Sequence, residues 1–152
     1  MRTSAGLLIY RTRAGQLEFL LVHPGGPFWK NKDAGAWTIP KGEVEADEDL
    51  LVTAKREVAE ELGINPSGSF IELSPVRQRG GKIIYAWAVE AELDPLQIKS
   101  NLFSMEWPPR SRQLQQFPEI DRAAWFDLET ARIRINPAQI PLLEELHSKQ
   151  RE

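Results

Sequence analysis

The chain of 152 residues has the length of one ordinary domain, so we expect a single domain over residues 1–152 with one core. Its 19 Lys and Arg residues against 22 Asp and Glu give a net charge of -3, which argues against a nucleic-acid backbone or an anionic membrane as a partner. The sequence has no Cys, which excludes disulfides, thiolate metal sites and thiol catalysis.

Two apolar runs of strand length begin the chain. Thr3 to Tyr10 and Leu17 to His23 are separated by the turn-like stretch Arg11 to Gln16, and this pattern predicts a hairpin. The first run is far shorter than a membrane span and carries no signal-peptide pattern, so a cytoplasmic location is expected. Several Gly and Pro residues follow in residues 24–40, which predicts a loop that includes a short strand at residues 37–39.

A helix is predicted for residues 49–62. This stretch lacks Gly and Pro and is rich in helix formers. Asp47 is the expected N-cap, and Gly63 supplies a C-terminal stop.

Three glutamates share one face of this predicted helix. At about 100° per residue, Glu57, Glu60 and Glu61 fall within an arc of about 100°. The arc adjoins the apolar stripe of the helix, which consists of Leu50, Leu51, Ala54, Val58 and Leu62. Like charges at the edge of packed structure repel and favour a compensating cation, and oxygen ligands suit Mg²⁺. A solvated acidic face is the alternative interpretation.

A second hairpin and a final helix are predicted further along the chain. Phe70 to Gln78 and Lys82 to Ala91 flank the turn signal Gly80-Gly81. Ala123 to Phe126 is a candidate short strand. After Pro137, an amphipathic terminal helix is expected from the spacing of its apolar residues, namely Ile140, Leu143 and Leu146.

Residues 100–118 are expected to be a long loop. The segment contains Pro108-Pro109 together with Phe103, Trp107 and the cations Arg110 and Arg112. Loops of this length are uncommon inside compact domains and are often functional. A substrate lid and a surface excursion anchored by aromatic residues are both open interpretations.

The residues around the acidic face follow a fixed spacing. Five residues separate Gly42 from Glu48, and seven more precede Arg56 and Glu57. The full segment GEVEADEDLLVTAKREVAEELGI, residues 42–64, resembles the signature of the Nudix hydrolase family at every defined position. The preceding residues 37–42, with the pattern Trp-x-x-Pro-Lys-Gly, resemble the lead-in of dinucleoside polyphosphate and diphosphoinositol polyphosphate hydrolases of that family.

The resemblance implies a fold and a metal site. The fold would be α+β, a Nudix-type α/β/α sandwich with a mixed β-sheet between helices. Mg²⁺, with Mn²⁺ as a substitute, would be held by Gly42, through its carbonyl, and by Glu57, Glu60 and Glu61. Arg56 resembles the family arginine that orients neighbouring acids. For Glu48, a role in catalysis or support and a role as a first-turn acid of the helix both remain open.

The resemblance also implies the reaction, which is attack of water on a diphosphate linkage of a nucleotide. Dinucleoside polyphosphates and nucleoside triphosphates are the leading substrates, and a nucleotide sugar such as ADP-ribose or a non-catalytic sensing role are the alternatives. Lys41, Arg77, Arg79 and Lys82 are candidate phosphate contacts, against the alternative of solvated surface cations. A monomer or a homodimer is expected.

The identity of the general base stays open at this level. Glu61 and Glu57 are candidates, and Glu106 and Glu119 offer a later carboxylate. Candidate stacking surfaces for a base are Phe28, Trp29, Trp87 and Trp107, each of which could equally be a core or loop anchor. His23 is expected to have a structural role.

Overall fold

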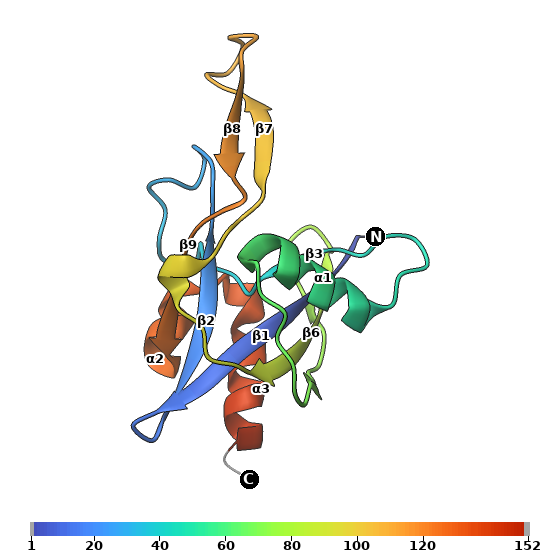
Figure 1. The fold of residues 1–152 in the computed structure, drawn as a ribbon, viewed down its shortest axis with the longest axis vertical. Helices are drawn as coiled ribbons and strands as arrows, with labels where there is room; N and C mark the ends of the chain where they lie inside the picture. The colour runs from blue at the N-terminus through green and yellow to red at the C-terminus, as the bar shows by residue number, and fades with distance from the viewer. Residues whose placement is uncertain (1, 151–152) are drawn as a thin grey trace.

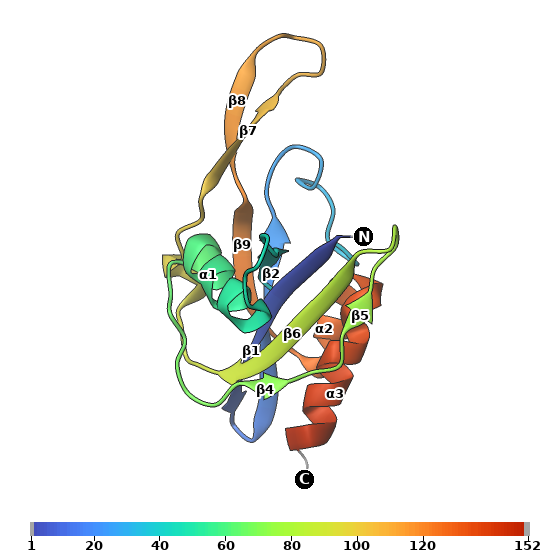
Figure 2. The ribbon, with the colours of Figure 1, turned by 90° about the vertical axis from the view of Figure 1, so that its right-hand side faces the viewer.

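The computed structural model describes residues 2–150, which form a mixed β-sheet between helices and a separate two-stranded arm (Figures 1 and 2). The main sheet runs in the order β4-β6-β1-β2-β9, with β3 also paired to β1 and β5 to β6. Its strands are β1 (Thr3–Arg13), β2 (Gln16–Pro24), β3 (Lys41–Glu43), β4 (Ile71–Glu72), β5 (Val76–Arg77), β6 (Ile83–Glu90) and β9 (Ile120–Asp127). The β1–β6 pair is parallel and the other pairs are antiparallel, so the sheet is mixed as expected.

Helices cover both faces of this sheet. Helix α1 (Leu50–Leu62) packs on one face, where Ala54, Val58 and Leu62 are buried. Helices α2 (Leu128–Arg134) and α3 (Ile140–Gln150) cover the other face, as Figure 2 shows. The predicted α/β/α sandwich is therefore confirmed. No helix within the described part of the chain has the length and apolar character needed to cross a membrane.

The N-terminal hairpin is confirmed, but its turn is tighter than the predicted stretch. Both strands extend further, and Ala14 and Gly15 alone connect them. Both residues have positive φ, 52° and 77°, as a two-residue hairpin turn requires. The strands continue beyond the apolar pattern of the sequence, because the residue pairs nearest the turn are hydrogen-bonded but face solvent.

Helix α1 begins at a different cap from the predicted one. The carboxylate of Asp49, not Asp47, accepts hydrogen bonds from the N–H groups of Leu51 and Val52, both at 3.1 Å. Asp47 has a positive φ of 64° in the preceding turn. The predicted stop is confirmed, because Gly63 ends the helix at φ 72°.

Several short elements differ from the sequence prediction. Residues 37–39 form only isolated bridges, Val22 with Thr38 and Trp37 with Ile135, instead of a strand. Strand β3 was not predicted, and it forms because its backbone pairs with β1. The predicted strand at residues 70–78 is split into β4 and β5 by residues 73–75, since Pro75 has no N–H to donate.

The loop predicted for residues 100–118 is instead a β-hairpin. Strands β7 (Leu102–Glu106) and β8 (Leu114–Pro118) pair only with each other. Figure 1 shows them rising away from the sheet as a narrow arm, which we call the β7–β8 arm (residues 102–118). The prediction was wrong because β7 and β8 contain none of the β-branched residues that signal a strand.

The C-terminal part combines a longer strand, an unpredicted helix and the expected one. Strand β9 runs beyond the predicted Ala123–Phe126, and α2 follows it directly with Asp127 as N-cap. After the 3₁₀ helix η2 (Pro137–Gln139), α3 buries Leu142, Leu143 and Leu146. The predicted terminal amphipathic helix is thus confirmed.

Candidate active site

The three glutamates of α1 lie at the border between the core and solvent. The side chain of Glu57 is 14% exposed and that of Glu60 is 42% exposed. Burial, followed by the charge of Glu57, raises the pKa of Glu61 to about 8. Burial also raises the pKa of Glu57. The acids therefore repel one another in a poorly solvated place, as the helical spacing predicted.

Arg56 binds three of the surrounding carboxylates. Its Nε and Nη2 donate to the two carboxylate oxygens of Glu48 at 2.8 and 3.0 Å. Its Nη1 donates to Glu57 at 3.0 Å and to Glu60 at 3.2 Å. The Arg56 hydrogen bond lowers the pKa of Glu48 to about 2. These contacts are what the expected orienting role of Arg56 requires, and they favour a supporting role for Glu48. Both roles stay predictions.

Gly42 lies directly against the carboxylate of Glu57. Strand β3 pairs with β1 in the register Ala5 to Gly42, which brings the backbone of Gly42 under α1. A Cβ at this position would lie 2.0 Å from Cδ of Glu57. Only a glycine leaves room for that carboxylate.

The chemistry of this group fits a divalent cation. One carboxylate oxygen of Glu61, Oε2, is buried without a hydrogen-bond partner. Among residues 2–150 no three acidic or His side chains are grouped closely enough to hold a metal, and Arg56 binds two of the proposed ligands, Glu57 and Glu60. An unpaired buried carboxylate oxygen beside further hard oxygen donors is the environment that Mg²⁺ or Mn²⁺ satisfies. The assignment of Gly42, Glu57, Glu60 and Glu61 as ligands stays a prediction.

Glu119, the residue before β9, joins this acidic group. Its charge contributes to raising the pKa values of Glu57 and Glu61, and its own pKa is raised by burial and by Glu60. The N–H of Gly25 donates to the carbonyl of Glu119 at 2.9 Å, which fixes this backbone to the end of β2. The structure therefore supports Glu119 as the later carboxylate over Glu106, whose oxygens accept the N–H groups of Arg110 and Arg112 at the arm tip.

Two lysines meet beside the acids. Burial and then the charge of Lys82 lower the pKa of Lys41 to about 8, and Glu61 opposes this shift. Lys41 comes from β3 and Lys82 from the turn before β6, so the fold brings two ammonium groups together next to a carboxylate. Arg77 and Arg79 are exposed on the same hairpin. Two adjacent ammonium groups at the edge of an acidic group are suited to binding a phosphate group.

Two other sequence candidates, His23 and Trp87, take structural positions, and Trp107 does not. His23 is fully buried, and its ring nitrogens lie 2.8 Å from Asp121 and 2.6 Å from the carbonyl of Lys32, which agrees with the expected structural role. Trp87 packs against the core under α1. Trp107 lies on the β7–β8 arm, outside the core.

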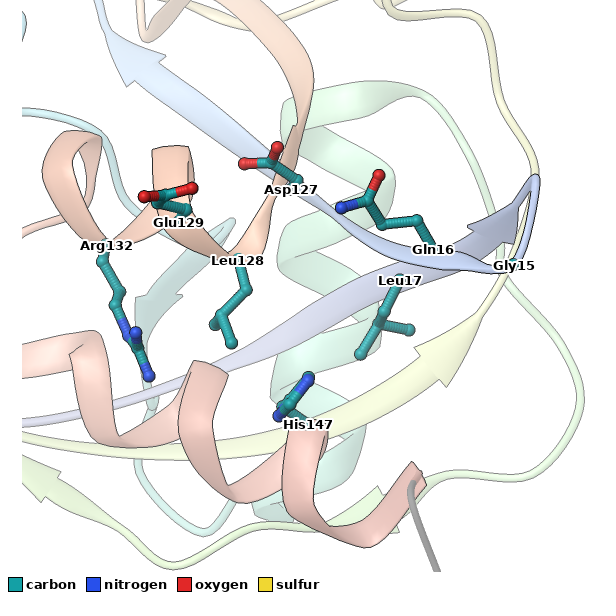
Figure 3. Close-up of a pocket in the computed structure, with 8 residues that line it drawn as sticks. All are labelled: Gly15, Gln16, Leu17, Asp127, Leu128, Glu129, Arg132 and His147. Carbon is teal, nitrogen blue, oxygen red and sulfur yellow. The ribbon is translucent and has the colours of Figure 1, made fainter.

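A pocket of about 450 Å³ at the far end of the sheet is separate from this acidic group (Figure 3). It lies between the β1–β2 turn, the start of α2 and His147 of α3. Two of its charged groups already have structural partners, because Asp127 caps α2 and Arg132 donates to Glu144 at 2.9 Å. No signature residue lines this pocket, so the acidic group stays the candidate site.

Comparison with known proteins agrees with the signature. The model of the NUDIX domain matches residues 1–146. The asymmetrical bis(5'-nucleosyl)-tetraphosphatase of Caenorhabditis elegans is 44% identical over 61 residues, which is 40% of this chain. The match also spans only 40% of that protein's length.

Solved structures share the fold over almost the whole chain. The binary complex of the C. elegans Ap4A hydrolase has a TM-score of 0.66 and 25% identity, covering 99% of this chain and 98% of that one. The NUDIX domain of Shewanella oneidensis NrtR complexed with ADP ribose has a TM-score of 0.65 at 17% identity, covering 97% and 87%. With its signature, its fold and a domain match over residues 1–146, the chain belongs to the Nudix family.

Proposed function

We propose that this chain is a metal-dependent hydrolase of a diphosphate linkage in nucleoside polyphosphates, with dinucleoside polyphosphates as the leading substrates. One observation carries the proposal, namely the buried and unpaired carboxylate oxygen of Glu61. Around it the chain gathers further acids and two lysines, which together suit a cation and a phosphate chain. The similarity to the C. elegans tetraphosphatase favours dinucleoside polyphosphates.

The residues that would hold a divalent cation are the carbonyl of Gly42 and the carboxylates of Glu57, Glu60 and Glu61. When bound, Mg²⁺ would neutralise charge on the phosphate oxygens and lower the pKa of a nearby water. Divalent metals are general cofactors of Nudix hydrolases. Mg²⁺ in particular, with Mn²⁺ as its substitute, is part of our proposal.

The protein's own groups would bind and orient the substrate and accept a proton. Lys41 and Lys82 would donate hydrogen bonds to phosphate oxygens at the edge of the acidic group. A carboxylate of Glu61, Glu57 or Glu119 would take the proton of the attacking water. Arg56, itself held by Glu48, would keep the carboxylates of α1 in place during turnover.

Two alternatives follow from the same fold. An ADP-ribose type of substrate has the NrtR domain as a precedent, but its 17% identity carries the fold alone. A sensing domain without turnover would bind nucleotide and release no product. The complete set of signature acids and the Arg56 network favour turnover over sensing.

The test is product release from a panel of dinucleoside polyphosphates, nucleoside triphosphates and ADP-ribose, with Mg²⁺ or Mn²⁺. We expect Glu61→Gln to lower turnover by about three orders of magnitude with the fold intact, because it removes charge and barely changes volume. Glu72→Gln, at an exposed glutamate of β4, is the matched control and should retain activity.

Two results would contradict the proposal. If the wild-type chain binds these nucleotides with either metal and releases no product, the sensing alternative is correct. If Glu61→Gln and Glu72→Gln have equal activity, the acidic group of α1 is not the site of the reaction.

A further inference from the structure

Exposed apolar side chains concentrate at the β7–β8 arm and the loop beside it. Phe28 is 63% exposed and Trp29 is 39% exposed, whereas the exposed Leu102 and Leu114 lie on the opposite face of the arm. Exposing an aromatic ring to water costs free energy. The exposed rings of Phe28 and Trp29 therefore indicate a contact surface. Figure 1 shows the loop that carries Phe28 and Trp29, after β2, rising on the same side of the sheet as the arm.

The loop and the arm hold one another in place. A Cβ at Gly26 would lie 2.9 Å from the ring of Phe103 on β7, so the loop backbone packs tightly on that ring. The rings of Phe28 and Trp107 meet edge to face, with 6.0 Å between their centroids. At the other end of the loop, the carbonyl of Lys32 lies 2.6 Å from Nε2 of the buried His23. The aromatic rings are thus presented on an ordered support.

The base of the arm and the start of the loop meet at Glu119, beside the acidic group. The N–H of Glu119 donates to the carbonyl of Asn101 at 2.8 Å, which closes the base of the arm. The N–H of Gly25 donates to the carbonyl of the same Glu119, so the loop and the arm start from one point. Glu119 is also close enough to Glu57 and Glu61 to raise their pKa values. The segments that carry the rings therefore begin beside the carboxylates.

Cations accompany the rings. The ammonium group of Lys32 lies 5.2 Å from the centroid of Trp29, and Lys30 is exposed next to it. At the arm tip the carboxylate of Glu106 accepts the backbone N–H groups of Arg110 and Arg112, both at 3.0 Å. Within residues 2–150 neither arginine side chain forms a salt bridge. Rings with nearby cations suit a ligand that combines a flat base with phosphate charge.

We propose that Phe28, Trp29 and Trp107 form a stacking site for the nucleobase that lies farther from the cleaved linkage. The inference rests on the proposed function and specifies its substrate class. The arm extends away from α1, the helix that carries Glu57, Glu60 and Glu61, in both views, so a ligand must be extended to reach both places (Figures 1 and 2). A dinucleoside polyphosphate has this form, with a base at each end and a phosphate chain that the cations can bind.

The test compares two ligands in the Glu61→Gln background, where binding is read without turnover. Calorimetry would measure a dinucleoside tetraphosphate and inorganic tripolyphosphate, each with Mg²⁺. Trp107→Leu and Phe28→Leu retain an apolar side chain and remove the flat ring. We expect each to weaken binding of the dinucleoside tetraphosphate about tenfold and to change binding of tripolyphosphate by less than about twofold.

A matched control lies on the same arm. Leu114→Ser removes an exposed apolar side chain from the face of β8 opposite Phe117, and it should change the affinity for neither ligand. Equal losses for both ligands in Trp107→Leu, or no loss for either, would overturn the stacking site. So would sedimentation showing that Trp107→Leu dissociates a dimer while nucleotide affinity stays unchanged, since the rings would then serve contact between two copies of the chain.

The outcomes separate this inference from the proposed function. If the wild-type chain hydrolyses dinucleoside polyphosphates and the aromatic variants bind them normally, only the stacking site is wrong. If the aromatic variants lose nucleotide affinity and the wild-type chain hydrolyses nothing, the stacking site stands and the catalytic proposal fails.

Discussion

At the scale of single residues, the contact between Gly42 and Glu57 decides where one carboxylate of the acidic group lies. A methyl group at Gly42 would overlap Cδ of Glu57, since the built Cβ lies 2.0 Å from it. The carboxylate must therefore move, together with its hydrogen bond to Arg56. The position of the Glu57 side chain therefore depends on the absence of a Cβ atom at residue 42.

We expect Gly42→Ala to lower kcat/KM by about 10- to 100-fold, the cost typical of displacing a group that supports a metal site. The same substitution in a Glu57→Ala background should cost far less, because no carboxylate remains to be displaced. Steady-state kinetics of the four proteins measures this coupling. Equal losses in the two backgrounds would show that Gly42 acts through the backbone of β3 instead.

A second residue-scale prediction concerns Asp33 and acid pH. Asp33 accepts a hydrogen bond from the indole of Trp37 at 2.7 Å and also binds Arg134, and these contacts lower the pKa of Asp33, the indole first. A pKa that is lower in the folded chain than the ordinary 3.8 means that the charged form stabilises the fold above that pH. The stabilisation by the charged Asp33 carboxylate is lost as the pH falls through the lowered pKa of Asp33.

Urea unfolding of the wild type and Asp33→Asn would measure this effect. We expect the wild type to be more stable at pH 7 and the difference in free energy of unfolding to narrow below pH 3.8. A difference that stays constant over the acid range would show that Asp33 acts through packing rather than charge.

At the scale of elements, α1 places the catalytic candidates because its start and end are both fixed. The carboxylate of Asp49 caps the first turn and Gly63 ends the last one. Between them the buried side chains of Ala54, Val58 and Leu62 set the rotation of the helix about its axis. That rotation leaves the glutamates at the border of the core.

The cap gives an element-scale prediction. Asp49→Ala should lower the free energy of unfolding by about 1 kcal/mol, because two N–H groups of α1 lose their acceptor. Asp47→Gly is the matched control, since glycine suits the positive φ of 64° at that position, and it should change stability by less than about 0.5 kcal/mol. Thermal or urea denaturation compares the two, and a larger loss in Asp47→Gly would place the cap at the residue first expected.

At the scale of the whole molecule, the sheet has an apolar layer on each face. One layer packs between the sheet and α1, the helix that carries the acidic group. The other layer packs between the opposite face of the sheet and helices α2 and α3. Strand β1 contributes to both layers, with Leu7 and Ile9 on the first face and Leu8 on the second. Loss of packing on either face should therefore destabilise the same sheet.

Leu143 of α3 tests this dependence, because its side chain is fully buried against the sheet. We expect Leu143→Ala to lower the free energy of unfolding by roughly 2–5 kcal/mol through lost burial and a residual cavity. Leu96→Ala, at a leucine that is 93% exposed, should cost less than about 0.5 kcal/mol. Urea denaturation compares them, and similar values would mean that α3 contributes little to the core.

Much of the fold could be predicted from the sequence because it depends on local patterns. The helical spacing of Glu57, Glu60 and Glu61, the turn at Gly80-Gly81 and the apolar spacing of α3 all involve residues within a few positions of one another. The predictions failed where pairing with a distant strand decides the conformation. The strand at Gly42 forms on β1, and the arm forms because β7 and β8 complete each other's hydrogen bonds.

The sequence by itself determined the signature and the acidic face of α1, since residue spacing and periodicity specify them directly. The α/β/α class followed from the resemblance of that signature to the Nudix family. Only the tertiary structure decided that Glu119 lies beside the glutamates of α1, that Lys82 meets Lys41, and that Trp107 meets Phe28. Each of these contacts joins residues from different elements. Their positions follow from how the strands pair and cross in the sheet, which no short stretch of sequence specifies.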